Sequence, residues 1–144
     1  MLRLTGLALP WAFPAMLCSA AAYAQAPAPR PMVIVDEATT MRREPPPHGA
    51  IGSSTAYRIS DAVPGRTMEF RKRILHPRSA IGLHRIAHDE VYYVLSGTGI
   101  VSSGGTTRPV RAGIAAYLFD GETVGIQQTG KAPLVLIIAY PLAK

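Results

Sequence analysis

Apolar and polar side chains alternate along most of the chain after residue 54, with the two-residue period of β-strands. Residues typical of turns separate the alternating runs, most clearly at Ser102-Ser103-Gly104-Gly105. About nine short strands with no helical periodicity predict an all-β fold, a jelly-roll β-barrel of antiparallel strands. The predicted strands cover residues 55–59, 66–75, 81–86, 90–95, 100–101, 106–111, 115–119, 123–128 and 133–140.

Two details of this pattern can be tested directly. Within 66–75, the apolar residues Met68, Phe70 and Ile74 share one face, and we expect that face to point into the core. Arg71 and Arg73 then lie on the other face, which we interpret as a solvated strand edge. A separate apolar run at residues 32–35 predicts a first strand.

The first 24 residues have the organisation of a signal peptide. Arg3 precedes an apolar stretch at 4–21, and Ala22-Tyr23-Ala24 provides small residues for cleavage after Ala24. We therefore expect an exported protein, periplasmic or secreted, with no membrane span once the signal is removed. The single cysteine, Cys18, leaves with the signal, so the remaining chain cannot form a disulfide or a thiolate metal site.

Composition divides the rest of the chain into a Pro-rich linker and N-terminal arm at 25–54 and a barrel domain at 55–144. His48 follows Pro45-Pro46-Pro47, and we expect it to be an exposed loop residue, with a cavity mouth or a subunit contact as the alternative. The net charge of +6 becomes +5 after loss of residues 1–24, since 14 Lys and Arg then face 9 Asp and Glu. The basic residues are spread along the sequence, so we expect no nucleic-acid partner.

The segment around residues 80–99 carries the most specific motif. His84, Glu90 and Gly97 are spaced as in the pattern glycine, spacer, His-x-His, three or four residues, Glu, six residues, Gly. This resembles the first motif of the cupin superfamily, and the chain is similar to small single-domain type 2 cupins. Ile86 stands where the motif has its second histidine.

A weaker second motif follows by spacing. Cupins have glycine, five residues, Pro-x-Gly, two residues, His, three residues, Asn. Gly113 and Gly121 keep this frame, which places Val124 at the histidine and Gln128 at the asparagine. The resemblance covers about residues 55–140 and implies the same jelly-roll barrel.

The resemblance also raises the question of whether this chain binds a metal, because cupin enzymes typically hold a metal with three histidines and one glutamate. Ile86 and Val124 cannot coordinate a metal, so the motif is degenerate and the cofactor is either none or a single divalent transition metal. His84, His88 and Glu90 would together give two histidines and one carboxylate, a set that serves iron and zinc. His88, however, falls in the turn between two predicted strands.

Without a metal, His84 and Glu90 would face each other as a hydrogen-bonded pair, since an unpaired buried charge is costly. Such a pair could act as an acid–base couple, which makes both residues catalytic candidates. We expect a small polar ligand to contact His84, Glu90, Tyr92 and Gln128. The expected pocket walls are Ile86, Val124, Tyr92 and either Phe70 or Met68.

Three functions remain open. The first is an exported cupin that binds a small polar molecule, such as a sugar or an organic acid, in its barrel. The second is a metal-dependent isomerase, lyase or dioxygenase that uses His84, His88 and Glu90, and the third is a structural protein with an inert pocket. The resemblance further implies a homodimer, for which the arm at 41–54 is a candidate contact.

Overall fold

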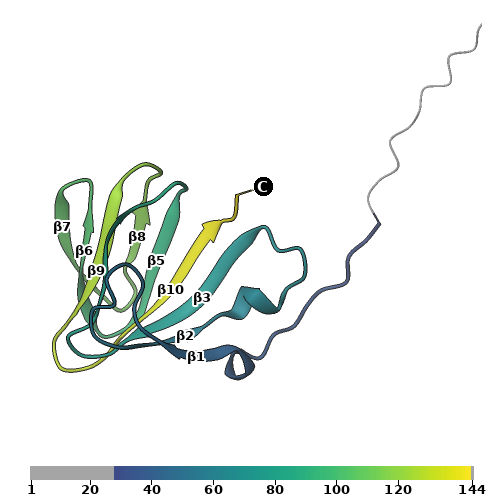
Figure 1. Cartoon of the computed structure of the whole chain (residues 1–144), viewed down its shortest axis with the longest axis horizontal. Coiled ribbons are helices and arrows are strands. Elements are labelled where there is room, and N and C mark those ends of the chain that lie inside the picture. Colours follow the sequence, from purple (N-terminus) through teal and green to yellow (C-terminus); the bar gives the residue numbers. More distant parts are fainter. Residues whose placement is uncertain (1–27, 144) are drawn as a thin grey trace, which may run out of the picture. The chain divides into compact units, whose positions relative to one another are not determined.

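Ten strands form two antiparallel sheets within residues 28–143, the part of the chain that this computed structural model describes (Figure 1). All of them belong to the compact unit Met32–Lys144. The predicted signal peptide, residues 1–24, lies outside the described residues. The strands are β1 (Met41–Glu44), β2 (Ser54–Tyr57), β3 (Met68–Leu75), β4 (Ala80–Arg85), β5 (Glu90–Ser96), β6 (Thr98–Ser103), β7 (Thr106–Arg111), β8 (Ala115–Leu118), β9 (Thr123–Thr129) and β10 (Leu134–Pro141).

The larger sheet has the order β1-β2-β3-β10-β5-β8 and the smaller one β4-β9-β6-β7. Figure 1 shows β10, in yellow, between β3 and β5 of the larger sheet. Buried side chains from both sheets form one core, with Leu75, Tyr92 and Leu136 from the larger sheet and Val124 and Ile126 from the smaller. This arrangement confirms the all-β, jelly-roll prediction. Two short 3₁₀ helices, η1 (Glu37–Thr40) and η2 (Ile59–Ala62), flank β1 and β2.

Among residues 28–143, no helix is both long and apolar enough to cross a membrane.

The prediction for the inward face of β3 is wrong. Glu69 and Arg73 are each 1% exposed, whereas Met68 is 50% and Phe70 39% exposed. β3 is not an edge strand, because β2 and β10 pair with it on either side. Arg73 is accommodated inside because it donates hydrogen bonds to the hydroxyl of Ser54 at 2.8 Å and to the carboxylate of Glu44 at 2.7 Å.

The strand predicted at residues 32–35 is also absent. Met32 and Ile34 are highly exposed, and the segment has no regular secondary structure. Apolar composition alone does not make a strand without a neighbouring strand to pair with. The first strand is instead β1, within the predicted arm, where Met41 pairs with Tyr57 of β2.

Residues 45–51, which we call the strap, form most of the connection between β1 and β2 and lie against β4. The amide of Gly82 donates to the carbonyl of Pro47 at 3.3 Å, and Ile51 forms an isolated bridge with Ala80. A side chain at Gly82 would place its Cβ only 1.6 Å from the carbonyl oxygen of His48. Glycine at position 82 is therefore what allows the strap to approach the barrel.

Candidate functional site

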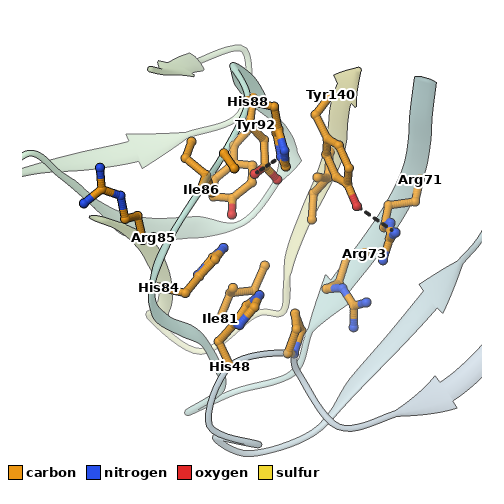
Figure 2. A pocket seen from close by; sticks show the side chains of 14 residues that line it. His48, Arg71, Arg73, Ile81, His84, Arg85, Ile86, His88, Tyr92 and Tyr140 are labelled. Carbon is orange, nitrogen blue, oxygen red and sulfur yellow. Dashed lines mark hydrogen bonds and ion pairs between the residues drawn. The ribbon is translucent and has the colours of Figure 1, made fainter. Parts of the chain in front are cut away.

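A cavity of about 340 Å³ is enclosed by the strap, β3, β4, the loop between β4 and β5, β5 and β10 (Figure 2). Its volume falls in the lower part of the usual range for small-molecule pockets. Its lining consists of Pro47, His48, Arg71, Arg73, Ile81, His84, Arg85, Ile86, Ala87, His88, Glu90, Tyr92, Ile138 and Tyr140.

An irregularity in β4 determines which of its residues face this cavity. The pairing of β4 with β9 shifts in register between Ile81 and His84. As a result, Ile81, His84 and Ile86 all line the cavity, and the intervening Leu83 is exposed. Residues 84 and 86 share one face, as predicted from the sequence. Ile81 lies on the same face because of the β-bulge, since simple alternation would place it on the other face.

His84 is held by the strap and by its own strand. Its ring stacks on that of His48, with centroids 3.5 Å apart and planes 8° from parallel (Figure 2). The Nδ1 atom of His84 lies 2.9 Å from the carbonyl oxygen of Gly82. Because a carbonyl can only accept, Nδ1 carries the proton of this hydrogen bond and Nε2 remains available to a ligand.

His48, expected in an exposed loop, lies at the alternative position, the cavity wall. Partial burial lowers the pKa of His48, and the neighbouring His84 lowers it further. A neutral His48 is compatible with the stacked pair, because two adjacent imidazolium rings would repel each other.

Glu90 contacts His88 rather than His84. Its Oε2 atom lies 3.5 Å from Nε2 of His88, whose ring stacks on Tyr140 with centroids 4.3 Å apart. Burial raises the pKa of Glu90 to about 7, while the charge of Arg71 and a hydrogen bond with Tyr92 act in the opposite direction. The predicted His84–Glu90 pair is thus replaced by two separate contacts on the cavity wall, His48–His84 and His88–Glu90.

Three arginines line the cavity. Arg71 donates through Nε to Glu69 at 2.7 Å and through a terminal nitrogen to the Tyr140 hydroxyl at 3.2 Å, the latter drawn as a dashed line in Figure 2. Burial lowers the pKa of Arg73, although its bond to Glu44 raises it. Arg85 is also on the lining, so three arginines border the cavity, of which Arg71 is paired with Glu69 and Arg73 with Glu44.

Two buried side-chain nitrogens in residues 28–143 lack a hydrogen-bond partner: Nε of Arg73, and Nε2 of His88, which lies 3.5 Å from Oε2 of Glu90 without a hydrogen bond between them. Both belong to residues that line this cavity. Buried donors without partners are uncommon in folded proteins and often mark a place where a ligand or water completes the hydrogen bonding.

Gln128, the fourth predicted ligand-binding residue, does not line this cavity. Its side-chain oxygen accepts from the amide of Arg78 at 2.8 Å, and its Nε2 donates to the carbonyls of Thr129, Gly130 and Ala132. The Gln128 side chain therefore stabilises the turn between β9 and β10 and does not face a ligand in this cavity. The expected walls Val124, Met68 and Phe70 are likewise outside the lining, whereas Ile86 and Tyr92 are part of it.

The side chains present do not fit the usual cupin metal site. Ile86 and Val124 supply no donor atom at two of its four positions, and of its two remaining positions His84 offers Nε2 and Glu90 its carboxyl group. In the part of the chain that the structure describes, no three His, Cys, Asp or Glu side chains are grouped to hold a metal ion. His84, His88 and Glu90 therefore share a cavity without forming a ligand set.

Four polar or charged lining residues were not predicted from the sequence: Arg71, Arg73, Arg85 and Tyr140. The signal for the first two was present, since Glu69, Arg71 and Arg73 have the same parity as the fully buried Leu75. Tyr140 could have been found from the alternation of β10, in which Leu134, Leu136 and Ile138 are buried on the same side.

No protein-family model matches the chain. Among solved structures, a predicted oxalate decarboxylase of Thermotoga maritima aligns with a TM-score of 0.68 and 26% identity over 77% of this chain and all of that one. A cupin 2 conserved barrel domain protein of Rhodopseudomonas palustris aligns with a TM-score of 0.62 and 17% identity, covering 72% of this chain and 73% of the other. The chain belongs to the cupin superfamily.

Within that superfamily, the sequence is similar to the oxalate-binding protein of Thermotoga maritima, with 32% identity over 75 residues. These residues are 51% of this chain and 62% of the relative, so the match spans less than two thirds of that protein. A sugar phosphate isomerase of Silicibacter pomeroyi shares the fold, with a TM-score of 0.63 and 16% identity over 77% of this chain and 76% of the other.

Proposed function

We propose that this protein is an exported cupin that binds a small organic acid, as its anion, in the cavity between the strap and the barrel. The observation that carries the proposal is the presence of three arginines on the lining, Arg71, Arg73 and Arg85, although Glu69 and Glu44 already pair with the first two. Guanidinium groups bind carboxylates through paired, charge-assisted hydrogen bonds.

An acid is favoured over a neutral sugar for two reasons. A carboxylate can accept charge-assisted hydrogen bonds from the guanidinium groups of the lining, whereas a neutral hydroxyl forms weaker ones. The relative with 32% identity is named an oxalate-binding protein, and oxalate is a small dicarboxylate. That this chain itself binds such an acid is part of the proposal.

Binding is favoured over metal-dependent catalysis because the lining lacks a metal-ligand set, as described above. Binding is also favoured over an inert pocket, because both unpartnered buried nitrogens, on Arg73 and His88, belong to the cavity lining. A ligand oxygen near either nitrogen would remove the cost of leaving a buried donor unsatisfied.

The test is isothermal titration calorimetry with oxalate, malonate, succinate and glucose, carried out with chelator present. We expect at least one of the acids to bind and glucose not to bind. Replacement of Arg71 by Met should weaken acid binding at least tenfold, because about 1.5–3 kcal/mol is typical of a hydrogen bond to a charged group. Arg108→Met, on the exposed part of β7, is the matched control and should bind as the parent does.

Binding of glucose in place of the acids, or equal acid affinity in the parent and the Arg71→Met variant, would contradict the proposal. Acid binding that appears only when a divalent metal is added would instead support the metal-dependent hypothesis.

A further inference from the structure

A chain of ion pairs links β1, η2 and β3, and both of its ends reach the cavity. Its N–O distances lie between 2.6 and 3.8 Å, and its members in order are Arg73, Glu44, Arg58, Asp61, Arg66, Glu69 and Arg71. The two terminal members, Arg73 and Arg71, both line the cavity. We call this set of residues the ion-pair chain.

The charges of the ion-pair chain do not balance. Four arginines alternate with three carboxylates, which leaves one positive charge in excess. Because the alternation begins and ends with an arginine, the missing negative charge belongs between Arg71 and Arg73. One carboxylate placed there closes the chain into a ring of alternating charges.

The free hydrogen-bond donors at the two ends agree with this count. Arg71 already donates from Nε and one terminal nitrogen, and Arg73 donates from both of its terminal nitrogens. The other terminal nitrogen of Arg71 and the buried, unpartnered Nε of Arg73 are left. Two donors match the two oxygens of a single carboxylate.

Neither Glu90 nor Arg85 changes this balance. Among the described residues, Glu90 has no ion pair with either terminal arginine and contacts His88 instead. A second ligand carboxylate near Glu90 would meet another carboxyl group and no free cation, which makes its burial costly. Arg85 lines the cavity but is exposed, and an exposed ion pair contributes little.

Another part of the lining is apolar, with Pro47, Ala87 and three buried isoleucines, Ile81, Ile86 and Ile138. Figure 2 shows Arg71 and Arg73 on one side of the cavity and Ile86 on the other. A ligand whose carboxylate lies at the arginines therefore extends over isoleucine side chains, where each buried methylene stabilises the complex.

We propose that the ligand is a monocarboxylate with an apolar body, whose carboxylate closes the ion-pair chain between Arg71 and Arg73 and whose body lies against the isoleucines. This inference rests on the proposed function, since it names the class of acid that the cavity binds. Such an acid differs from oxalate, which has two carboxylates and no apolar part.

Calorimetric titration of the purified protein near neutral pH tests the proposal with straight-chain acids from acetate to valerate, the weakest of them measured by displacement of valerate. We expect the affinity to rise about fourfold for each added methylene until the cavity is filled. Butyrate and valerate should bind at least about tenfold more tightly than succinate and glutarate, which have the same numbers of carbons and a second carboxylate.

Two variants separate the two ends of the ligand. Arg71→Met should weaken acetate and valerate by the same factor, because both acids have the carboxylate. Ile138→Val removes one methylene from the lining and should weaken valerate about threefold while acetate is unaffected. Ile126→Val is the matched control and should bind both acids as the parent does, because Ile126 is also buried in the core but does not line the cavity.

Equal affinity along the acid series, or succinate binding more tightly than butyrate, would overturn the assignment of a monocarboxylate while leaving acid binding in place. Failure of every acid to bind, with one carboxylate or two, would instead contradict the proposed function and this inference with it.

Discussion

At the scale of single residues, Glu90 shows how burial changes the chemistry of a carboxyl group. It is almost fully buried at the cavity wall and contacts His88. Burial raises its pKa from 4.5 to about 7, so that near neutral pH it can either donate or accept a proton. A carboxylic acid that is protonated there can donate a hydrogen bond to the oxygen of a bound anion.

This pKa leads to a prediction about stability. A raised pKa means that the folded state binds the proton more tightly than the unfolded state does. The stabilisation is therefore complete below about pH 4.5 and is lost as the pH rises to about 7. The difference between a pKa of 4.5 and one of about 7 corresponds to at most about 3.5 kcal/mol.

In urea unfolding, the parent's free energy of unfolding should decrease between pH 4.5 and 7 because of Glu90, and this decrease should be absent from the Glu90→Gln variant. At pH 8 the variant should therefore be more stable than the parent. Glu122→Gln, in the turn before β9, serves as the control for loss of a carboxylate elsewhere. A Glu90→Gln variant that is less stable than the parent at pH 8 would show that the ionised carboxylate is stabilised in the fold.

At the scale of elements, the strap depends on one close approach. His48, Gly49 and Ala50 have φ values of 59°, 121° and 51°, so three consecutive residues adopt left-handed backbone conformations. Two of them are not glycine, and such residues are seldom found there unless surrounding contacts compensate. The amide of Gly82 and the ring of His84 supply these contacts.

Replacement of Gly82 by Ala should therefore displace the strap, because the new Cβ would overlap the His48 carbonyl. We expect faster proteolysis within residues 45–51 and at least tenfold weaker acid binding, with the barrel retained in far-UV circular dichroism. Gly105→Asn is the control, since no atom lies within 4 Å of a Cβ there and Asn tolerates the positive φ. Unchanged proteolysis in Gly82→Ala would mean that the strap does not depend on this approach.

Elements also show what the sequence could and could not predict. Nine of the ten strands, β2 to β10, followed from alternation, because the period of two is a local property of the chain. The inward face of β3 did not, since it depends on Glu44 and Ser54, which are distant in sequence and compensate Arg73. The site was predicted in part: His84, Glu90 and Tyr92 line one cavity. The contribution of His48 depends on the path of the strap, which composition does not specify.

At the scale of the whole molecule, export is a proposal that rests on residues 1–24. We expect protein expressed in a bacterial host to be recovered outside the cytoplasm, with an intact mass that corresponds to a chain beginning at Gln25. Deletion of residues 2–24 should leave it in the cytoplasm. Recovery of the uncleaved chain from the membrane fraction would instead favour an anchor.

The place of β10 in the larger sheet has a consequence for the order of events in synthesis. Residues 134–141 pair with both β3 and β5, so the six-stranded sheet is divided into two parts until these residues have been made. Contacts between such distant segments form slowly, because loop closure costs entropy before the contact gains energy. The larger sheet therefore cannot be completed before nearly the whole chain has been made, a delay that suits the proposed export of an unfolded chain.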